Sequence, residues 1–239
     1  SFNFLTAFSN LKTCSFTDFN YLTSNQRVDY IIEQTNYYGY SGERVKGLMF
    51  CSSKKEAAAL SERLNLRGYQ TIALSGEDSQ EKREDAIDRL VSNTRSDYLQ
   101  YILTVDIFNE GVDIPEINQV VLLRPTQSPI VFVQQLGRGL RKSKGKEYVV
   151  ILDFIGNYKN NFMIPIALSG DRSYNKDNIR RYVLEGERII PGSSTIHFDE
   201  ISKKQIFASI DTANFADIKL IKDSYKNLKN KLGRIPGIL

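Results

Sequence analysis

Short apolar runs alternate with helical patterns between residues 45 and 153, and this alternation constrains the possible fold more than any other feature of the sequence. The runs are dense in Val, Ile and Leu, which is typical of strands that are buried on both faces of a sheet. The predicted strands are 46–53, 69–74, 99–105, 117–123 and 147–154. Strands that alternate with helices favour a parallel sheet covered on both faces, so we expect an α/β fold.

Apolar residues at helical spacing predict helices between and around these strands. Those helices span 25–42, 54–68, 78–93, 128–141, 179–192 and 217–233. Gly68 stands where a C-terminal cap belongs, and Asp78 and Glu81 have the spacing of a capping box. The last helix carries an apolar stripe and a lysine-rich face, which we interpret as a solvated surface rather than as a phosphate-binding one.

Composition places the chain among ordinary soluble globular proteins. Hydrophobic residues make up 41% and charged residues 25% of its 239 residues. The net charge of +4 suits an anionic partner but does not require one. No apolar run approaches the roughly 18 residues of a membrane span, and residues 1–10 lack the features of a signal peptide. We therefore expect a cytoplasmic protein without membrane contact.

Cysteine and histidine are too few for a disulfide framework or a metal site. Cys14 and Cys51 match no zinc-binding spacing. His197 is the single histidine and lies in a strand-like context, where a structural role is the simpler interpretation. The sequence therefore predicts no metal ion held by this chain alone.

A glycine and an aspartate follow the strand at 99–105, in the segment TVDIFNEGVDIP. Gly111 would let a ligand approach the backbone closely. Asp113 can accept hydrogen bonds from a ribose hydroxyl, as acidic residues do in other nucleotide sites. The alternative is an ordinary turn in which Asp113 caps the loop, and this segment alone does not decide between them.

Two arginines share a helical face in the segment VQQLGRGLRKSKGK. Gln134, Gly137, Arg138 and Arg141 form the pattern Q-x-x-G-R-x-x-R, which places the two guanidinium groups side by side. Like charges at this spacing repel, whereas both groups match the oxygen atoms of a phosphate. The alternative is a solvated basic helix end. The bracketing glycines, each about 1 kcal/mol unfavourable in a helix, favour close approach of a ligand instead.

Four segments, in this order, resemble motifs IV, IVa, V and VI of the second RecA-like domain of superfamily 2 helicases. They are LMFCSS, ALSGEDSQEKRE, TVDIFNEGVDIPEINQVV and QQLGRGLRKSKGK, within residues 45–153. Motifs V and VI are specific together, and motif IV much less so. The Q-x-x-G-R-x-x-R form is more similar to restriction and repair motors than to DEAD-box proteins, which usually begin this motif with His. The resemblance implies a RecA-like parallel sheet sandwiched by helices, with a mixed or helical C-terminal extension.

The resemblance also implies a division of the chain. We expect an N-terminal linker segment at 1–25, the helicase C-terminal RecA-like domain at 26–168 and a C-terminal extension at 169–239 that ends in an amphipathic helix. The tail is similar to that of bacterial helicases with further domains on either side. Because the chain also begins without Met, we expect it to be a fragment of a longer protein.

The resemblance gives the motif residues roles around ATP. Arg141 corresponds to the arginine finger that reaches the γ-phosphate, and Arg138 assists it as a second catalytic residue. Gln134 is expected at the interdomain cleft, Asp113 at the ribose and Gly111 at the edge of the nucleotide. Arginines placed in this way stabilise charge on the transferred phosphoryl group, an effect of about 10³–10⁵ in rate.

The same resemblance assigns contacts with the nucleic-acid backbone to Ser52, Ser53, Gly76 and Thr104. Contacts of this kind read little sequence and depend strongly on salt. The form of the arginine motif favours DNA over RNA as the partner, in restriction or repair.

Half of a phosphoryl-transfer site is missing from the sequence. It has neither a G-x-x-x-x-G-K-[ST] phosphate loop nor an acidic D-E-x-x box for Mg²⁺. We therefore expect ATP and Mg²⁺ to bind with an N-terminal RecA-like domain of the same polypeptide, absent from this chain, and we expect this chain alone to be inactive as an ATPase. Two alternatives stay open. One is a non-catalytic nucleic-acid-binding module on the same scaffold. The other is a small α/β enzyme or nucleotide-binding domain of a different class, although no G-x-G-x-x-G occurs.

Overall fold

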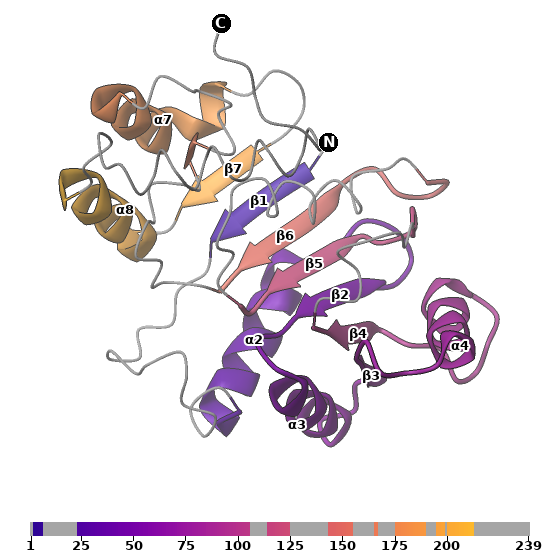
Figure 1. Ribbon diagram of the computed structural model, residues 1–239. Helices are drawn as coiled ribbons and strands as arrows, with labels where there is room; N and C mark the ends of the chain where they lie inside the picture. Colours follow the sequence, from indigo (N-terminus) through magenta and orange to yellow (C-terminus); the bar gives the residue numbers. More distant parts are fainter. Residues whose placement is uncertain are drawn as a thin grey trace, which may run out of the picture.

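The computed structural model describes residues 2–6, 23–105, 114–124, 143–154, 165–166, 175–189, 195–198 and 200–212. Within these residues, the strands form one sheet in the order β3-β4-β2-β5-β6-β1-β7 (Figure 1). Every pairing in the sheet is parallel. The strands are β1 (Phe2–Thr6), β2 (Gly47–Phe50), β3 (Thr71–Leu74), β4 (Tyr101–Thr104), β5 (Gln119–Leu122), β6 (Val149–Asp153) and β7 (Thr195–Phe198). The strands predicted from the alternating pattern are confirmed as β2 to β6.

Helices cover both faces of the sheet because successive strand residues point to opposite sides. In β2, Leu48 and Phe50 join one hydrophobic core, and Met49 joins the other. The first core is closed by α4 (Gln80–Val91), α7 (Lys176–Ile189) and α8 (Glu200–Thr212). The second is closed by α2 (Asn25–Tyr38) and α3 (Lys54–Asn65). The expected α/β fold, a RecA-like parallel sheet sandwiched by helices, is therefore confirmed.

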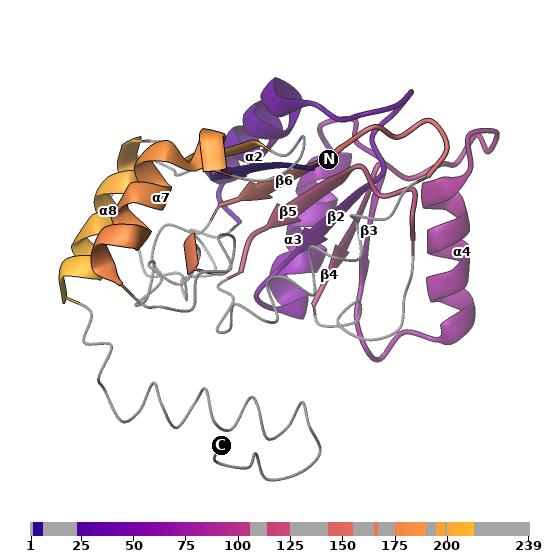
Figure 2. The ribbon, with the colours of Figure 1, turned by 90° about the horizontal axis from the view of Figure 1, so that it is seen from above.

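The sheet extends beyond the range that the sequence predicted for the RecA-like domain. Strand β1 pairs with β6, and β7 pairs with β1, so segments near both ends of the described chain lie side by side. Helices α7 and α8 group at this end of the sheet, and α4 lies at the other end (Figure 2). The sequence patterns predicted α7 but neither β1 nor α8. The helices predicted for 128–141 and 217–233 lie outside the described residues.

Serine side chains begin three helices. Ser24, Ser53 and Ser79 each accept a hydrogen bond from the backbone N–H three residues ahead, in α2, α3 and α4. The capping box predicted for Asp78 and Glu81 was wrong, since Ser79 is the cap of α4. The Asp78 carboxylate instead folds back and accepts the backbone N–H of Ser75 at 2.6 Å. It therefore shapes the turn between β3 and α4.

The end of α3 differs slightly from the predicted glycine cap. Leu66 follows the helix in a right-handed conformation, and Gly68 adopts a φ of 86° two residues later. The N–H of Gly68 donates to the carbonyl oxygen of Asn65 at 3.0 Å. The glycine thus supports the turn that leaves the helix, although it is not the capping residue itself.

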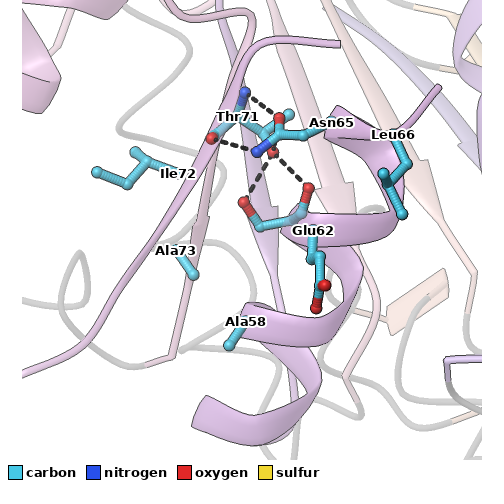
Figure 3. A pocket seen from close by; sticks show the side chains of 8 residues that line it. Ala58, Glu62, Asn65, Leu66, Thr71, Ile72 and Ala73 are labelled. Atoms are coloured by element: carbon cyan, nitrogen blue, oxygen red, sulfur yellow. Dashed lines mark hydrogen bonds between the residues drawn. The ribbon is translucent and has the colours of Figure 1, made fainter. Parts of the chain in front are cut away.

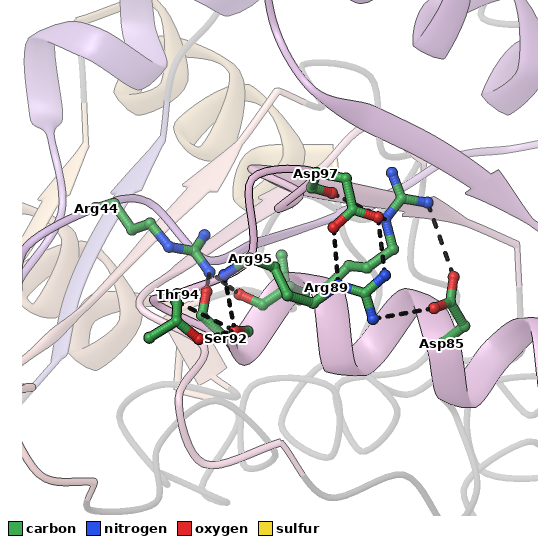
Figure 4. A network of polar contacts seen from close by, with 8 residues as sticks. Arg44, Asp85, Arg89, Ser92, Thr94, Arg95 and Asp97 are labelled. Carbon is green, nitrogen blue, oxygen red and sulfur yellow. Dashed lines mark hydrogen bonds and ion pairs between the residues drawn. The ribbon is translucent and has the colours of Figure 1, made fainter.

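Arg44 ties the end of α4 to the start of β4. Its guanidinium group donates to the carbonyl oxygens of Leu90 at 2.6 Å and Leu99 at 2.8 Å, and also to that of Ser92 (Figure 4). The group lies 4.9 Å from the centroid of the Tyr98 ring. Carbonyl groups at a helix end have no partner within the helix, so a cation at this position satisfies them.

Candidate nucleic-acid interface

The predicted nucleic-acid contacts meet at the carboxyl ends of three neighbouring strands. Strand β4 lies between β3 and β2, and Thr104, its last residue, pairs in register with Leu74 of β3 and Phe50 of β2. Ser52 and Ser53 follow β2, and Gly76 follows β3. Open parallel sheets bind ligands at this edge. The structure therefore brings Ser52, Ser53, Gly76 and Thr104 to one edge of the sheet.

The loop between β2 and α3 presents two exposed serines, Ser52 and Ser53. The Ser53 hydroxyl accepts the backbone N–H of Glu56 at 3.2 Å as the cap of α3. The backbone N–H of Ser52 donates to the Glu56 carboxylate at 2.7 Å. Glu56 thus fixes the loop from its inner side, and both serine residues are exposed.

The loop between β3 and α4 is held by side chains that leave Gly76 open. Arg83 donates to the carbonyl oxygens of Gly76 at 2.9 Å and Asp78 at 2.7 Å. Gly76 is exposed, and a Cβ atom added there would meet no other atom within 4 Å. A ligand can therefore approach the backbone at Gly76 without displacing a side chain.

An exposed ion pair joins the two loops. The ammonium group of Lys54, at the start of α3, lies 2.5 Å from the carboxylate of Glu77 in the loop after β3. The N-termini of α3 and α4 consequently lie at the same sheet edge. The dipole of a helix favours an anionic group at its N-terminus, so this edge offers two such positions to a group such as phosphate.

Thr104 differs from the other predicted contact residues because it is completely buried. Its carbonyl oxygen accepts the N–H of Cys51 at 2.9 Å. Its hydroxyl has no hydrogen-bond partner in the described part of the chain. Burial gives no support to a direct contact with nucleic acid, and the visible role of Thr104 is to hold the strand end that precedes the serine loop.

A buried ion pair lies directly beneath the serine loop, and the sequence patterns did not predict it. The Nη2 atom of Arg27 in α2 lies 3.7 Å from the Oε1 atom of Glu56. Burial raises the pKa of Glu56, and the Arg27 charge, the N–H and hydroxyl groups of Ser52 and the N–H of Ser53 act against this rise. The capping-box spacing of Ser53 and Glu56 is the sequence signal that could have revealed the carboxylate.

The residues predicted to act on ATP lie outside the described residues. They are Gly111, Asp113, Gln134, Arg138 and Arg141. Their roles therefore stay predictions. In the part of the chain that is described, no group of three or more His, Cys, Asp or Glu side chains could hold a metal ion. No described helix is long and apolar enough to cross a membrane.

Two pockets lie away from this edge. One, of about 580 Å³, lies between α3 and β3 and is lined by apolar side chains such as Ala58 and Ala73 together with polar ones such as Glu62 (Figure 3). The other, of about 300 Å³, is lined by tyrosines together with Arg44. No residue predicted from the sequence as a site residue lines either pocket.

The sequence of this chain matches a known protein family. Residues 25–143 match the model of the helicase conserved C-terminal domain. The chain is 27% identical over 153 residues to IRC3 of Saccharomyces cerevisiae, which is named as an ATP-dependent helicase. It is 29% identical over 131 residues to the ATP-dependent RNA helicase DBP3 of Vanderwaltozyma polyspora. These alignments cover 64% and 49% of this chain but only 22% and 24% of the two relatives.

Solved structures share the fold. A fragment of the HsdR subunit of a type I restriction enzyme from Vibrio vulnificus matches with a TM-score of 0.54 and 21% identity, over 67% of this chain and 33% of that one. The C-terminal domain of the DEAD-box protein Dbp5 matches with a TM-score of 0.51 and 19% identity, over 86% of this chain and 96% of that one. At this level of identity, the likeness concerns the fold alone.

Proposed function

Because residues 25–143 of this chain are a helicase conserved C-terminal domain, we propose that the chain is the second motor domain of an ATP-dependent nucleic-acid helicase or translocase. The observation that carries the proposal is the meeting of Ser52, Ser53 and Gly76 at one exposed sheet edge, beside two helix N-termini. These groups are the hydroxyls, the open backbone and the dipole ends that suit phosphate oxygens.

The nucleic acid contacts this edge through its sugar-phosphate backbone. Serine hydroxyls and helix N-termini bind phosphate without reading bases, so affinity depends little on sequence and falls steeply with salt. We propose DNA as the preferred partner, on the form of the arginine motif. DBP3, an RNA helicase by name, makes RNA the alternative that a binding comparison must include.

The arginine segment acts on ATP that is bound mainly by the first RecA-like domain of the same polypeptide. Arg141 is the arginine finger and Arg138 assists it. Gln134 lines the cleft between the domains, and Asp113 and Gly111 meet the nucleotide. That other domain supplies the phosphate loop and the ligands of Mg²⁺, because this chain contains neither motif.

Substitution of Arg141 in the parent protein tests the arginine finger. Arg141→Ala lowers nucleic-acid-stimulated ATP turnover by about 10³–10⁵ and leaves the affinity for ATP nearly unchanged. Arg141→Lys is the matched control, since it keeps the charge but loses the fork of donors. Turnover that is indifferent to both substitutions would leave the arginines as a basic patch, and the chain as a non-catalytic nucleic-acid-binding module.

The 239-residue chain provides a second test. It binds nucleic acid in a salt-sensitive manner but hydrolyses no ATP, because the phosphate loop is absent. Appreciable ATP turnover by the pure chain would contradict the proposal that it is half of a two-domain motor.

A further inference from the structure

The Glu56 carboxylate lies within one hydrogen bond of the surface at which the proposed phosphate binds. Its side chain is completely buried, yet it accepts the backbone N–H of exposed Ser52 at 2.7 Å. A negative charge in this position stabilises the loop, because it accepts the N–H of Ser52 and interacts favourably with the dipole at the N-terminus of α3. The same charge repels an incoming phosphate, and burial in a low-dielectric interior lengthens the reach of this repulsion.

Arg27 is the cation that balances this charge. Its guanidinium group is also buried, with 4% of the residue exposed, and lies 3.7 Å from the Glu56 carboxylate. A hydrogen bond of 3.4 Å from its Nη2 atom to the carbonyl oxygen of Leu123 holds the group against the end of β5. The arginine thus reaches the carboxylate from α2 and lies near its Oε1 atom, whereas Ser52 donates to its Oε2 atom.

We propose that Arg27 and Glu56 are positioning residues of the nucleic-acid interface. Glu56 sets the conformation of the loop at Ser52 and Ser53, and Arg27 cancels the carboxylate charge so that a phosphate can bind above it. Neither side chain touches the nucleic acid. This inference rests on the proposed function, and it predicts that the two residues affect affinity in opposite directions.

Three variants of the 239-residue chain separate charge from structure. Arg27→Gln leaves the carboxylate unbalanced, and we expect affinity for nucleic acid to fall by about threefold to tenfold at low salt. Glu56→Gln keeps an oxygen that accepts from Ser52 and leaves the Arg27 charge unbalanced, and we expect tighter binding by a similar factor. The double variant restores neutrality, and we expect an affinity near that of the wild type.

The matched control is the ion pair of the half-buried Arg67 with the exposed Asp29 of α2, whose Nε and Oδ1 atoms lie 2.7 Å apart. Arg67 follows the far end of α3, about 18 Å along the helix from Lys54. Arg67→Gln and Asp29→Asn make the same changes in net charge as the two buried substitutions. Because this pair lies at the far end of α3 and is far more exposed than Arg27 and Glu56, we expect much smaller changes in affinity.

Affinity is measured by fluorescence anisotropy with fluorescein-labelled single-stranded DNA and with RNA of matched sequence, over a salt series. Circular dichroism establishes that each variant is folded at the assay temperature. If Arg27→Gln does not fold, Glu56→Gln decides: tighter binding supports the inference, and weaker or unchanged binding overturns it.

The remaining outcomes separate the two proposals. A wild-type chain that binds neither nucleic acid contradicts the proposed function, and with it this inference. A wild-type chain that binds while all three buried variants weaken together shows a purely structural pair, and the inference alone is wrong. Equal effects of the buried and exposed substitutions would show that only net charge matters, which also overturns it.

Discussion

The side-chain amide of Asn65 forms hydrogen bonds with both backbone groups of Thr71 (Figure 3). Its nitrogen donates to the Thr71 carbonyl oxygen at 3.2 Å, and its oxygen accepts the Thr71 N–H at 2.8 Å. Thr71 begins β3, which stands at the end of the strand order. Asn65 therefore occupies the place of a neighbouring strand at this residue, and it protects a sheet edge that could otherwise pair with another chain.

We expect Asn65→Ala to destabilise the protein by about 1–3 kcal/mol, because it leaves both Thr71 groups without their partner. The exposed edge is also expected to increase self-association at high protein concentration. Urea unfolding and light scattering after size exclusion measure the two effects. Asn65→Asp is the control, since it keeps the acceptor for the N–H and loses only the donor. Unchanged stability in Asn65→Ala would refute the role of this amide.

Gly47 in β2 allows the ring of Tyr101 to pack against the backbone. A Cβ atom at Gly47 would lie 2.2 Å from Cδ1 of that ring. The ring cannot easily move, because Tyr101 is buried and its hydroxyl donates to the side-chain oxygen of Gln119 at 2.6 Å. We expect Gly47→Ala to lower the free energy of unfolding by about 1–3 kcal/mol or more.

Gly76→Ala is the matched control for this substitution, because a Cβ atom there meets nothing within 4 Å. Its stability in urea should equal that of the wild type within about 0.5 kcal/mol. A Gly47→Ala variant as stable as Gly76→Ala would show that the strands adjust to the extra methyl group.

The thiol of Cys51 is expected to be unreactive in the folded protein. Burial, with the nearby Glu56 charge, raises the pKa of Cys51 well above its ordinary value. The thiolate is the nucleophilic form, so both access and ionisation are suppressed. In a Cys14→Ser background, we expect iodoacetamide to react roughly a hundredfold more slowly with the native chain than with the chain in denaturant. Equal rates would show that the carboxyl end of β2 opens readily.

Asp97 contributes stability that disappears in acid. It belongs to a surface network in which Arg95 and Arg89 lie 2.8 Å and 3.2 Å from its carboxylate, and Asp85 pairs with both arginines (Figure 4). The hydrogen bonds from Arg95 lower the pKa of Asp97 from 3.8 to about 2. Because the pKa is lower in the folded state, the contribution is complete above pH 3.8 and is lost as the pH falls to about 2.

Asp97→Asn should therefore lower the thermal unfolding midpoint slightly at neutral pH, and this effect should vanish as the pH falls to about 2. Salt should reduce the difference, since the network is exposed. Asp88→Asn, which removes an exposed carboxylate of α4 without an ion pair in the described chain, is the control. If the difference in unfolding midpoint between Asp97→Asn and wild type grew as the pH fell, the ion pair would not stabilise the charged form of Asp97, and the prediction would be wrong.

Local patterns were sufficient for the central part of the fold. The apolar runs predicted β2 to β6, and the helical spacing predicted α2, α3, α4 and α7, because periodicity records which faces are buried. The family resemblance assigned Ser52, Ser53 and Gly76 to the nucleic acid, and the structure brings them to one edge of the sheet. The roles predicted for the ATP residues, including Arg138 and Arg141, rest on the sequence alone, since these residues lie outside the described part of the chain.

The elements that the sequence patterns did not predict depend on contacts between segments that are distant along the chain. Phe2–Thr6 has no period of its own, and it is a strand because β6 and β7 pair with it. Asp78 does not cap α4, because its carboxylate accepts the backbone N–H of Ser75 in the preceding turn. Ser79 is the capping residue instead.

By itself, the sequence determined the alternation of strands and helices in the central part of the chain, because hydrophobic periodicity acts over a few residues. The tertiary structure alone decided that Glu56 is buried against Arg27 and that Asn65 covers the edge of β3. In each of these cases, a polar group gains a partner only when a separate element packs beside it, and burial then makes that partner necessary.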